Sequence, residues 1–216
     1  MRPGCSTLLA SLAVALLATA PQAQAATITV TSPLDTSGNG AICTLRDAIT
    51  AANNNAPAGG CAAGSPYPAL DTINIPQSRN TCLIGGCVII PGSPLPTIVE
   101  DVSIVGTGNW TPVINGSNAR RIFDLGGVVV NLTNLTLING YASGAGEAGF
   151  GGAIRTSALG TTLTVNRLTL SGNRASNRGG ALHVSGGTVT VNDSTFTNNT
   201  ADYYGGAIGQ NNGVLI

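Results

Sequence analysis

The sequence predicts an all-β protein: a right-handed parallel β-helix with three short strands in each coil and a short N-terminal capping helix. Three observations lead to this prediction, namely the composition, a recurring motif, and aliphatic residues whose alternation changes phase. The 216 residues are 43% hydrophobic and 8% charged, and they include 30 glycines. Many aliphatic and few charged residues exclude a disordered chain, and abundant glycine indicates many tight turns. A formal net charge of zero argues against a nucleic-acid partner.

The recurring motif is Gly-Gly-Ala followed by an aliphatic residue. Its copies occupy residues 151–154, 179–182 and 205–208, at intervals of 28 and 26 residues. A second pattern has one apolar residue, two residues of any kind, and then two apolar residues separated by one. Its copies are Val99-Val102-Ile104, Leu132-Leu135-Leu137, Val165-Leu168-Leu170 and, with serine in the middle place, Val191-Ser194-Phe196. Repeats of this length are typical of solenoids, whose units bury their apolar residues only by stacking.

The alternation of apolar residues predicts a bend within each repeat. Leu163 and Val165 alternate with polar neighbours, as in a half-buried strand, whereas Leu168 and Leu170 alternate on the opposite parity. One straight strand cannot bury both pairs on one face, so the chain must turn at residues 166–167. A parallel sandwich is the alternative, but its strands need long helical crossovers, and no helical pattern lies between these strands.

Stacking of the coils should place equivalent residues above one another. We expect Leu137, Leu170 and Phe196 to form one continuous column inside the helix. A corner column should include two asparagines that share amide hydrogen bonds; its expected members are Glu100, Thr133, Asn166 and Asn192.

Residues 26–70 are expected to cap the first coil, and residues 71–216 to form about four coils. Thr44 and Asp47 have the spacing of a helix capping box, and apolar residues follow at helical intervals. The pattern therefore predicts a helix over about residues 44–53 that covers the open end of the stack. Residues 27–31 read as a strand ahead of this helix, and residues 71–75 as the first strand of the stack.

The first 25 residues have the features of a secretory signal peptide. An arginine at position 2 precedes an apolar run from Leu8 to Ala20, which is too short to span a bilayer. The small residues before Ala26 predict cleavage between Ala25 and Ala26. A membrane anchor is the alternative for this segment. The remainder of the chain has no apolar stretch long enough to span a membrane, so the mature protein is expected to be exported, at the outer-membrane surface or outside the cell.

Four cysteines remain after that cleavage: Cys43, Cys61, Cys82 and Cys87. An even number in an exported chain indicates disulfides. Three pairings are possible, and proximity in sequence favours Cys43–Cys61 with Cys82–Cys87. A zinc site is the alternative, but the spacings are irregular and the chain's one histidine, His183, is distant.

Two segments carry a family resemblance. Cys43-Thr44-Leu45-Arg46-Asp47-Ala48, followed by Ala51-Ala52-Asn53, resembles the CSLREA domain of exported bacterial proteins, with threonine and aspartate replacing the serine and glutamate of the name. The segment from Ser194 to Ile208 resembles polymorphic outer membrane protein repeats. The resemblance implies a pectate-lyase-like β-helix on a secreted or surface protein, often an adhesin or an autotransporter passenger. It implies no particular reaction.

The distribution of acids argues against catalysis. Glycoside hydrolysis needs two carboxyl groups on either side of the scissile bond, and no two of the acids considered are expected to stack on adjacent coils; these are Glu100, Asp101, Asp124, Glu147, Asp193 and Asp202. We expect no enzyme activity, no cofactor and no metal within these residues. His183 is expected at the surface, and Tyr203-Tyr204 in a loop that covers the core.

The most plausible function from the sequence is a structural, adhesin-like surface protein that presents loops to an unidentified surface protein or glycan. The candidate surface is the insertion from Tyr141 to Phe150, because loops on rigid scaffolds commonly carry binding. The coil that begins at residues 205–208 stops at Ile216, so we expect further coils or an anchoring domain beyond it. The alternative is a polysaccharide-active enzyme, a lyase or glycosidase, with its catalytic coil beyond Ile216.

Overall fold

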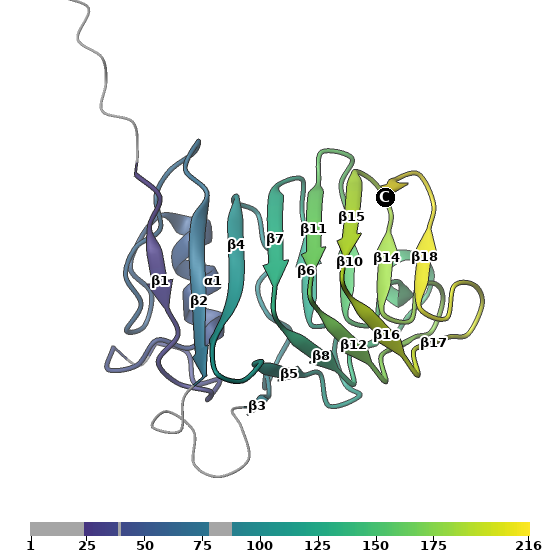
Figure 1. The fold of residues 1–216 in the computed structure, drawn as a ribbon, viewed down its shortest axis with the longest axis horizontal. Coiled ribbons are helices and arrows are strands. Elements are labelled where there is room, and N and C mark those ends of the chain that lie inside the picture. The colour runs from purple at the N-terminus through teal and green to yellow at the C-terminus, as the bar shows by residue number, and fades with distance from the viewer. Residues whose placement is uncertain (1–23, 39, 78–87) are drawn as a thin grey trace, which may run out of the picture.

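The computed structural model describes residues 24–38, 40–77 and 88–216. The expected signal peptide lies outside the described residues except for its last two positions, and so do Cys82 and Cys87. Strands predominate, and the helices of the described chain are α1 (Leu45–Asn54) and the short 3-10 helix η1 (Gly146–Gly149). The strands form parallel sheets that wrap around one core, with α1 at the N-terminal end (Figure 1).

Four sheets make up the walls of the structure. The seven-stranded sheet contains β1 (Thr27–Thr29), β2 (Asp71–Gln77), β4 (Val102–Gly108), β7 (Val129–Thr133), β11 (Thr162–Asn166), β15 (Thr188–Asn192) and β19 (Val214–Leu215). The five-stranded sheet contains β3 (Val88–Ile89), β5 (Val113–Asn115), β8 (Thr136–Ile138), β12 (Thr169–Ser171) and β16 (Thr195–Thr197). The four-stranded sheet contains β6 (Phe123–Leu125), β10 (Ile154–Thr156), β14 (Leu182–Val184) and β18 (Ile208–Gln210), and the three-stranded sheet contains β9 (Tyr141–Ala142), β13 (Arg174–Ala175) and β17 (Thr200–Ala201).

Successive coils of the chain supply neighbouring strands in each sheet, and these strands run parallel. This arrangement confirms the expected parallel β-helix. Two details differ from the expectation. The coils from β7 onward carry a fourth strand of two residues, because the turn after β8, β12 and β16 leaves room for a short extra ladder. The sheet also begins one strand earlier, because β1 pairs with β2 and extends the stack.

The apolar column inside the helix is present. Leu137 pairs with Leu170, and Leu170 pairs with Phe196. The same column continues toward the N-terminus through Ile114 and Ile89. The expected column of apolar residues inside the helix is therefore confirmed.

The first copy of the aliphatic pattern lies in a different register from the predicted one. Ile104 pairs with Leu132 rather than with Leu137, and Val102 pairs with Val130. Val99 is 51% exposed. The reason is the length of β4, which continues for seven residues before the chain bends. Val105, and not Glu100, consequently occupies the corner column.

The predicted bends coincide with left-handed backbone conformations. Arg167 and Asp193 have φ values of 54° and 46°, and Asn134, which occupies the same place one coil earlier, has 56°. A second corner repeats this feature at Asn139, Gly172 and Asn198. Asparagine, aspartate and glycine adopt this region at low cost, so the residue types at the corners help to turn the chain.

An internal asparagine ladder stabilises the second corner, and it is not the ladder that the sequence suggested. Asn173 is fully buried, and its Nδ2 donates to the carbonyl of Leu137 at 3.1 Å and to Oδ1 of Asn199 at 3.0 Å. Its Oδ1 accepts from the backbone N–H of Gly140 at 2.8 Å. Asn166 and Asn192 pair in register, but none of the described hydrogen bonds includes their side chains. The side-chain amide of an asparagine that turns inward can bond buried backbone groups. The amide of one on the outer face can bond water instead, so it gains little from a bond to its neighbour.

Replacing Asn173 should therefore reduce stability. Asn173→Ala is expected to lower the free energy of unfolding by about 1–2 kcal/mol, because it leaves the buried N–H of Gly140 without an acceptor. Urea denaturation followed by circular dichroism measures the effect. Asn166→Ala is the matched control and should change the free energy by less than about 0.5 kcal/mol. Equal losses in the two variants would contradict the structural role of the ladder.

The N-terminal segment packs its helix against the first strands. Thr44 is the N-cap of α1, and its Oγ1 accepts from the backbone N–H of Asp47 at 3.1 Å and donates to the Asp47 carboxylate at 2.9 Å. The helix ends at a left-handed C-cap, Asn55. The expected apolar face is buried against the first strands, and its members are Leu45, Ala48, Ile49 and Ala52.

Two further contacts hold this segment together. A disulfide joins Cys43 to Cys61. Arg46 forms a bidentate ion pair with Asp35, with N–O distances of 2.9 and 2.7 Å. It also donates to the backbone carbonyls of Ser93 and Pro94. Arg46 of α1 thus joins the loop after β1 to the loop after β3.

Candidate functional site

A cluster of charged and polar side chains lies on the outer face of the four-stranded sheet. Asp124, Arg155 and His183 occupy equivalent places on β6, β10 and β14. Their neighbours along each strand point into the core, so alternation directs these three side chains outward. Residues 143–151, here called the strap, cross this face and cover it.

Arg121 and Arg155 hold the base of the strap. Nε of Arg121 donates to the carbonyls of Phe150 and Gly151 at 3.1 and 3.0 Å, and its Nη2 donates to the carbonyl of Ala148 at 2.9 Å. Arg155 donates to the carbonyl of Glu147 at 2.9 Å. The base is therefore fixed by charged donors, which form stronger hydrogen bonds than neutral groups do.

The same arginines neutralise Asp124. Arg155 binds its two carboxylate oxygens at 2.9 and 2.7 Å, and Arg121 lies 3.6 Å from one of them. Burial and, to a smaller extent, the charge of Arg155 lower the pKa of Arg121, Asp124 partly offsets both, and the resulting pKa is about 10. Arg121 thus remains a cation at neutral pH.

His183 is fully buried, so its expected surface position is wrong. The ring stacks on Phe150 with centroids 4.1 Å apart, and Nδ1 lies 3.0 Å from the hydroxyl oxygen of Ser185. Burial, followed by the positive charges of Arg178 and Arg155, lowers the pKa of His183 to about 4. The ring is neutral at neutral pH. The strap causes the burial, and the one aromatic residue of the strap, Phe150, was the sequence signal that could have indicated it.

Exposed tyrosines and an arginine border the strap. Tyr203 and Tyr204 are 71% and 68% exposed, so they do not cover the core as expected. The guanidinium carbon of Arg178 lies 5.3 Å from the ring centroid of Tyr204 and 6.0 Å from that of Phe150. Nη1 of Arg178 donates to Oδ1 of Asn211 at 2.5 Å.

The expected candidate surface, Tyr141 to Phe150, divides into a structural and an exposed part. Tyr141 and Ala142 form β9 and pair with β13. Gly149 and Phe150 are buried. The part that reaches solvent is therefore residues 143–148, at the tip of the strap.

Asp124 and Glu147 both lie within 4 Å of Arg155, and three other acids named from the sequence have separate structural roles. Asp101 accepts from the backbone N–H of Val129 at 2.8 Å, and Asp202 pairs with Arg174 at 3.1 Å. Asp193 occupies a left-handed corner. Within the described ranges, no three His, Cys, Asp or Glu side chains gather where they could hold a metal ion. The arrangement supplies hydrogen-bonding and stacking surfaces rather than a pair of carboxyl groups facing each other across a groove.

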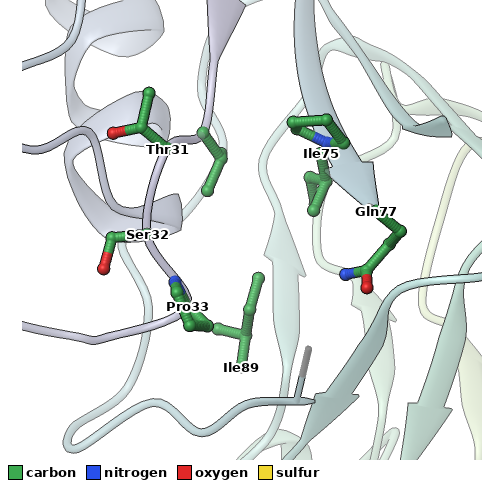
Figure 2. Close-up of a pocket in the computed structure, with 8 residues that line it drawn as sticks. Thr31, Ser32, Pro33, Ile75, Gln77 and Ile89 are labelled. Carbon is green, nitrogen blue, oxygen red and sulfur yellow. The ribbon is translucent and has the colours of Figure 1, made fainter. Parts of the chain in front are cut away.

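The structure also has a small, partly open hollow near the N-terminal end (Figure 2). Thr31, Ser32 and Pro33 line one side, Ile75 and Gln77 line the other, and Ile89 lies beside Pro33. The lining is mostly apolar and contains no ionisable group, so it offers no acid, base or nucleophile. No helix in the described part of the chain is both long and apolar enough to cross a membrane.

Two segments of the chain match the Chlamydia polymorphic membrane protein repeat, at residues 167–185 and 193–209. Each segment begins at a left-handed corner residue and ends after the Gly-Gly-Ala motif. The two matches therefore cover the same part of two successive coils. This repeat is typical of surface-exposed proteins of the outer-membrane type, and its family is not an enzyme family. No curated protein and no solved structure matches the chain. The resemblance to the CSLREA domain and to pectate lyases remains a prediction.

Proposed function

We propose that this chain is a surface-exposed, adhesin-like β-helical protein that presents the tip of the strap and its border to a partner. The strap carries this proposal. The side chains of its tip, residues 143–148, are exposed, whereas Arg121 and Arg155 bind backbone carbonyls of residues 147–151 and so fix the path of the loop. A loop with a rigid base loses less conformational freedom on binding than a free loop does.

The residues that border the strap suit a binding surface. Tyrosine and arginine are enriched at the energetically important positions of protein interfaces, and both occur here with large exposed areas. Tyr204 lies beside Arg178, and Tyr141 lies beside Arg174, whose guanidinium carbon is 5.7 Å from the ring centroid. The partner is a protein or glycan of another cell or of the surrounding matrix.

Exchanging the tip of the strap tests this proposal. Residues 143–148 are replaced by a Gly-Ser segment of equal length, and the full chain is displayed on a non-adherent bacterium. Attachment to host cells or matrix is expected to fall about tenfold, because the exchange removes the Glu147 side chain and the 3-10 turn that shapes the exposed loop. The urea unfolding midpoint should stay unchanged, because Arg121 and Arg155 bind backbone carbonyls, which a Gly-Ser segment retains. Replacing the half-buried Ala158 and the exposed Leu159 by Gly-Ser is the control at another loop and should leave attachment intact. Equal attachment by the strap variant and the unaltered chain would exclude the strap as the binding surface.

A further inference from the structure

Asp71 is a buried carboxylate without a cationic partner. The residue is 2% exposed, and none of the ion pairs among the described residues includes it. Oδ2 accepts from the backbone N–H of Ser65 at 2.8 Å, and Oδ1 accepts from the backbone N–H of Ala26 at 2.8 Å. Aspartate is almost never this deeply buried unless a cation or several hydrogen bonds compensate its charge. Two neutral amide groups are a weak compensation.

Ala26 is also the residue after the predicted cleavage site. The backbone N–H of Thr72 donates to its carbonyl at 2.8 Å, and the next residue, Thr27, pairs with Thr72 in the β1–β2 ladder. These contacts hold the nitrogen of Ala26 next to Asp71. Gln24 and Ala25, on the other side of the bond, are exposed and belong to no strand.

We propose that the bond between Ala25 and Ala26 is a processing site, and that Asp71 binds the ammonium group which cleavage creates. Water is added across the amide bond: Ala25 leaves with a carboxylate, and Ala26 keeps its nitrogen as an ammonium group at neutral pH. The nitrogen that was a neutral donor becomes a cation at the same 2.8 Å contact. Processing therefore supplies the missing counter-ion of a buried carboxylate and locks β1 onto the stack.

This assignment explains two features of the sequence together. The small residues at positions 23 and 25 suit removal of the leader, and the aspartate that opens β2 lies opposite the new terminus. It also makes the folded mature form more stable than the folded precursor, because a hydrogen bond between charged groups is about twice as strong as one between neutral groups.

The composition of the chain makes a clean test possible. Residues 26–216 contain no lysine, so the α-amino group is the one primary amine of a product made from these residues, and acetic anhydride at neutral pH removes that charge selectively. The full chain is exported from a bacterial host, and the mass of the product should begin at Ala26. Acetylation should increase the unfolding equilibrium constant about tenfold, as expected for loss of a charge-assisted contact. A product that begins at another residue, or an unchanged unfolding curve after acetylation, would overturn the proposal.

Variants identify the carboxylate that responds. In Asp71→Asn, acetylation should leave the unfolding equilibrium constant unchanged within twofold. Asp101→Asn is the matched control, because the Asp101 carboxylate also accepts a backbone N–H at 2.8 Å, from Val129, whereas its contact with Asp71 is made by its backbone carbonyl, which the substitution keeps. It should keep the tenfold effect. If Asp71→Asn does not fold, Asp71→Glu tests the same contact, and its response to acetylation should persist. A full response in Asp71→Asn would show that another group binds the ammonium.

Discussion

Gly180→Ala should lower the free energy of unfolding by about 3 kcal/mol, the largest loss that we expect from removing or adding a single group in the stack. A Cβ atom at Gly180 would lie 2.1 Å from the carbonyl oxygen of Gly206 and 2.3 Å from that of Thr200. Both atoms belong to the backbone of the next coil, which cannot rotate away as a side chain can. The coils would have to separate locally, and ladder hydrogen bonds would lengthen.

The last coil supplies the control for this prediction. Gly206 has the same place in the Gly-Gly-Ala motif, but the nearest atom to an added Cβ, the carbonyl oxygen of Asn199, is 3.2 Å away. Gly206→Ala should therefore cost less than about 1 kcal/mol. Urea denaturation of both variants measures the difference. Losses of the same size would mean that backbone approach between coils does not explain the second glycine of the motif.

Acidification should destabilise the folded protein by about 3 kcal/mol through His183 alone. The pKa of this group is lowered to about 4 in the folded state, mainly by burial, against about 6.5 in an unfolded chain. Above about pH 6.5 both states are neutral and the full stability is present. As the pH falls below that value, the unfolded chain binds a proton that the folded chain excludes. Stability is therefore lost down to about pH 4, where the folded state also becomes protonated.

The chain contains one histidine, so a variant isolates this contribution. Between about pH 7.5 and about pH 5, the unaltered protein should lose about 2 kcal/mol of unfolding free energy, and His183→Gln should lose much less. Urea unfolding at several pH values provides the measurement. Comparing the change with pH, rather than the absolute stability, removes the effect of the altered contact with Phe150. Parallel curves for the two proteins would show that His183 does not titrate under the strap.

The sequence alone determined the repeating architecture. Aliphatic residues that alternate on opposite parities require a bend, and a repeat too small to bury its own apolar surface must stack. The column through Leu137, Leu170 and Phe196 follows from this local pattern, as do the corners at Arg167 and Asp193. The capping helix was predictable for the same reason, because Thr44 and the apolar residues after it lie within one short segment.

Only the tertiary structure decided what covers the outside of the stack and where ionic groups meet. The sequence places His183 at the surface, whereas in the structure the ring of Phe150 covers it. The register of β4 depends on how far this strand continues before the chain bends. The contact between Ala26 and Asp71 joins residues 45 positions apart. Periodicity specifies which side chains face inward, because that depends on neighbours along the chain. It does not specify which distant segments cross an outer face, since that depends on loop paths and on the charges that fix them.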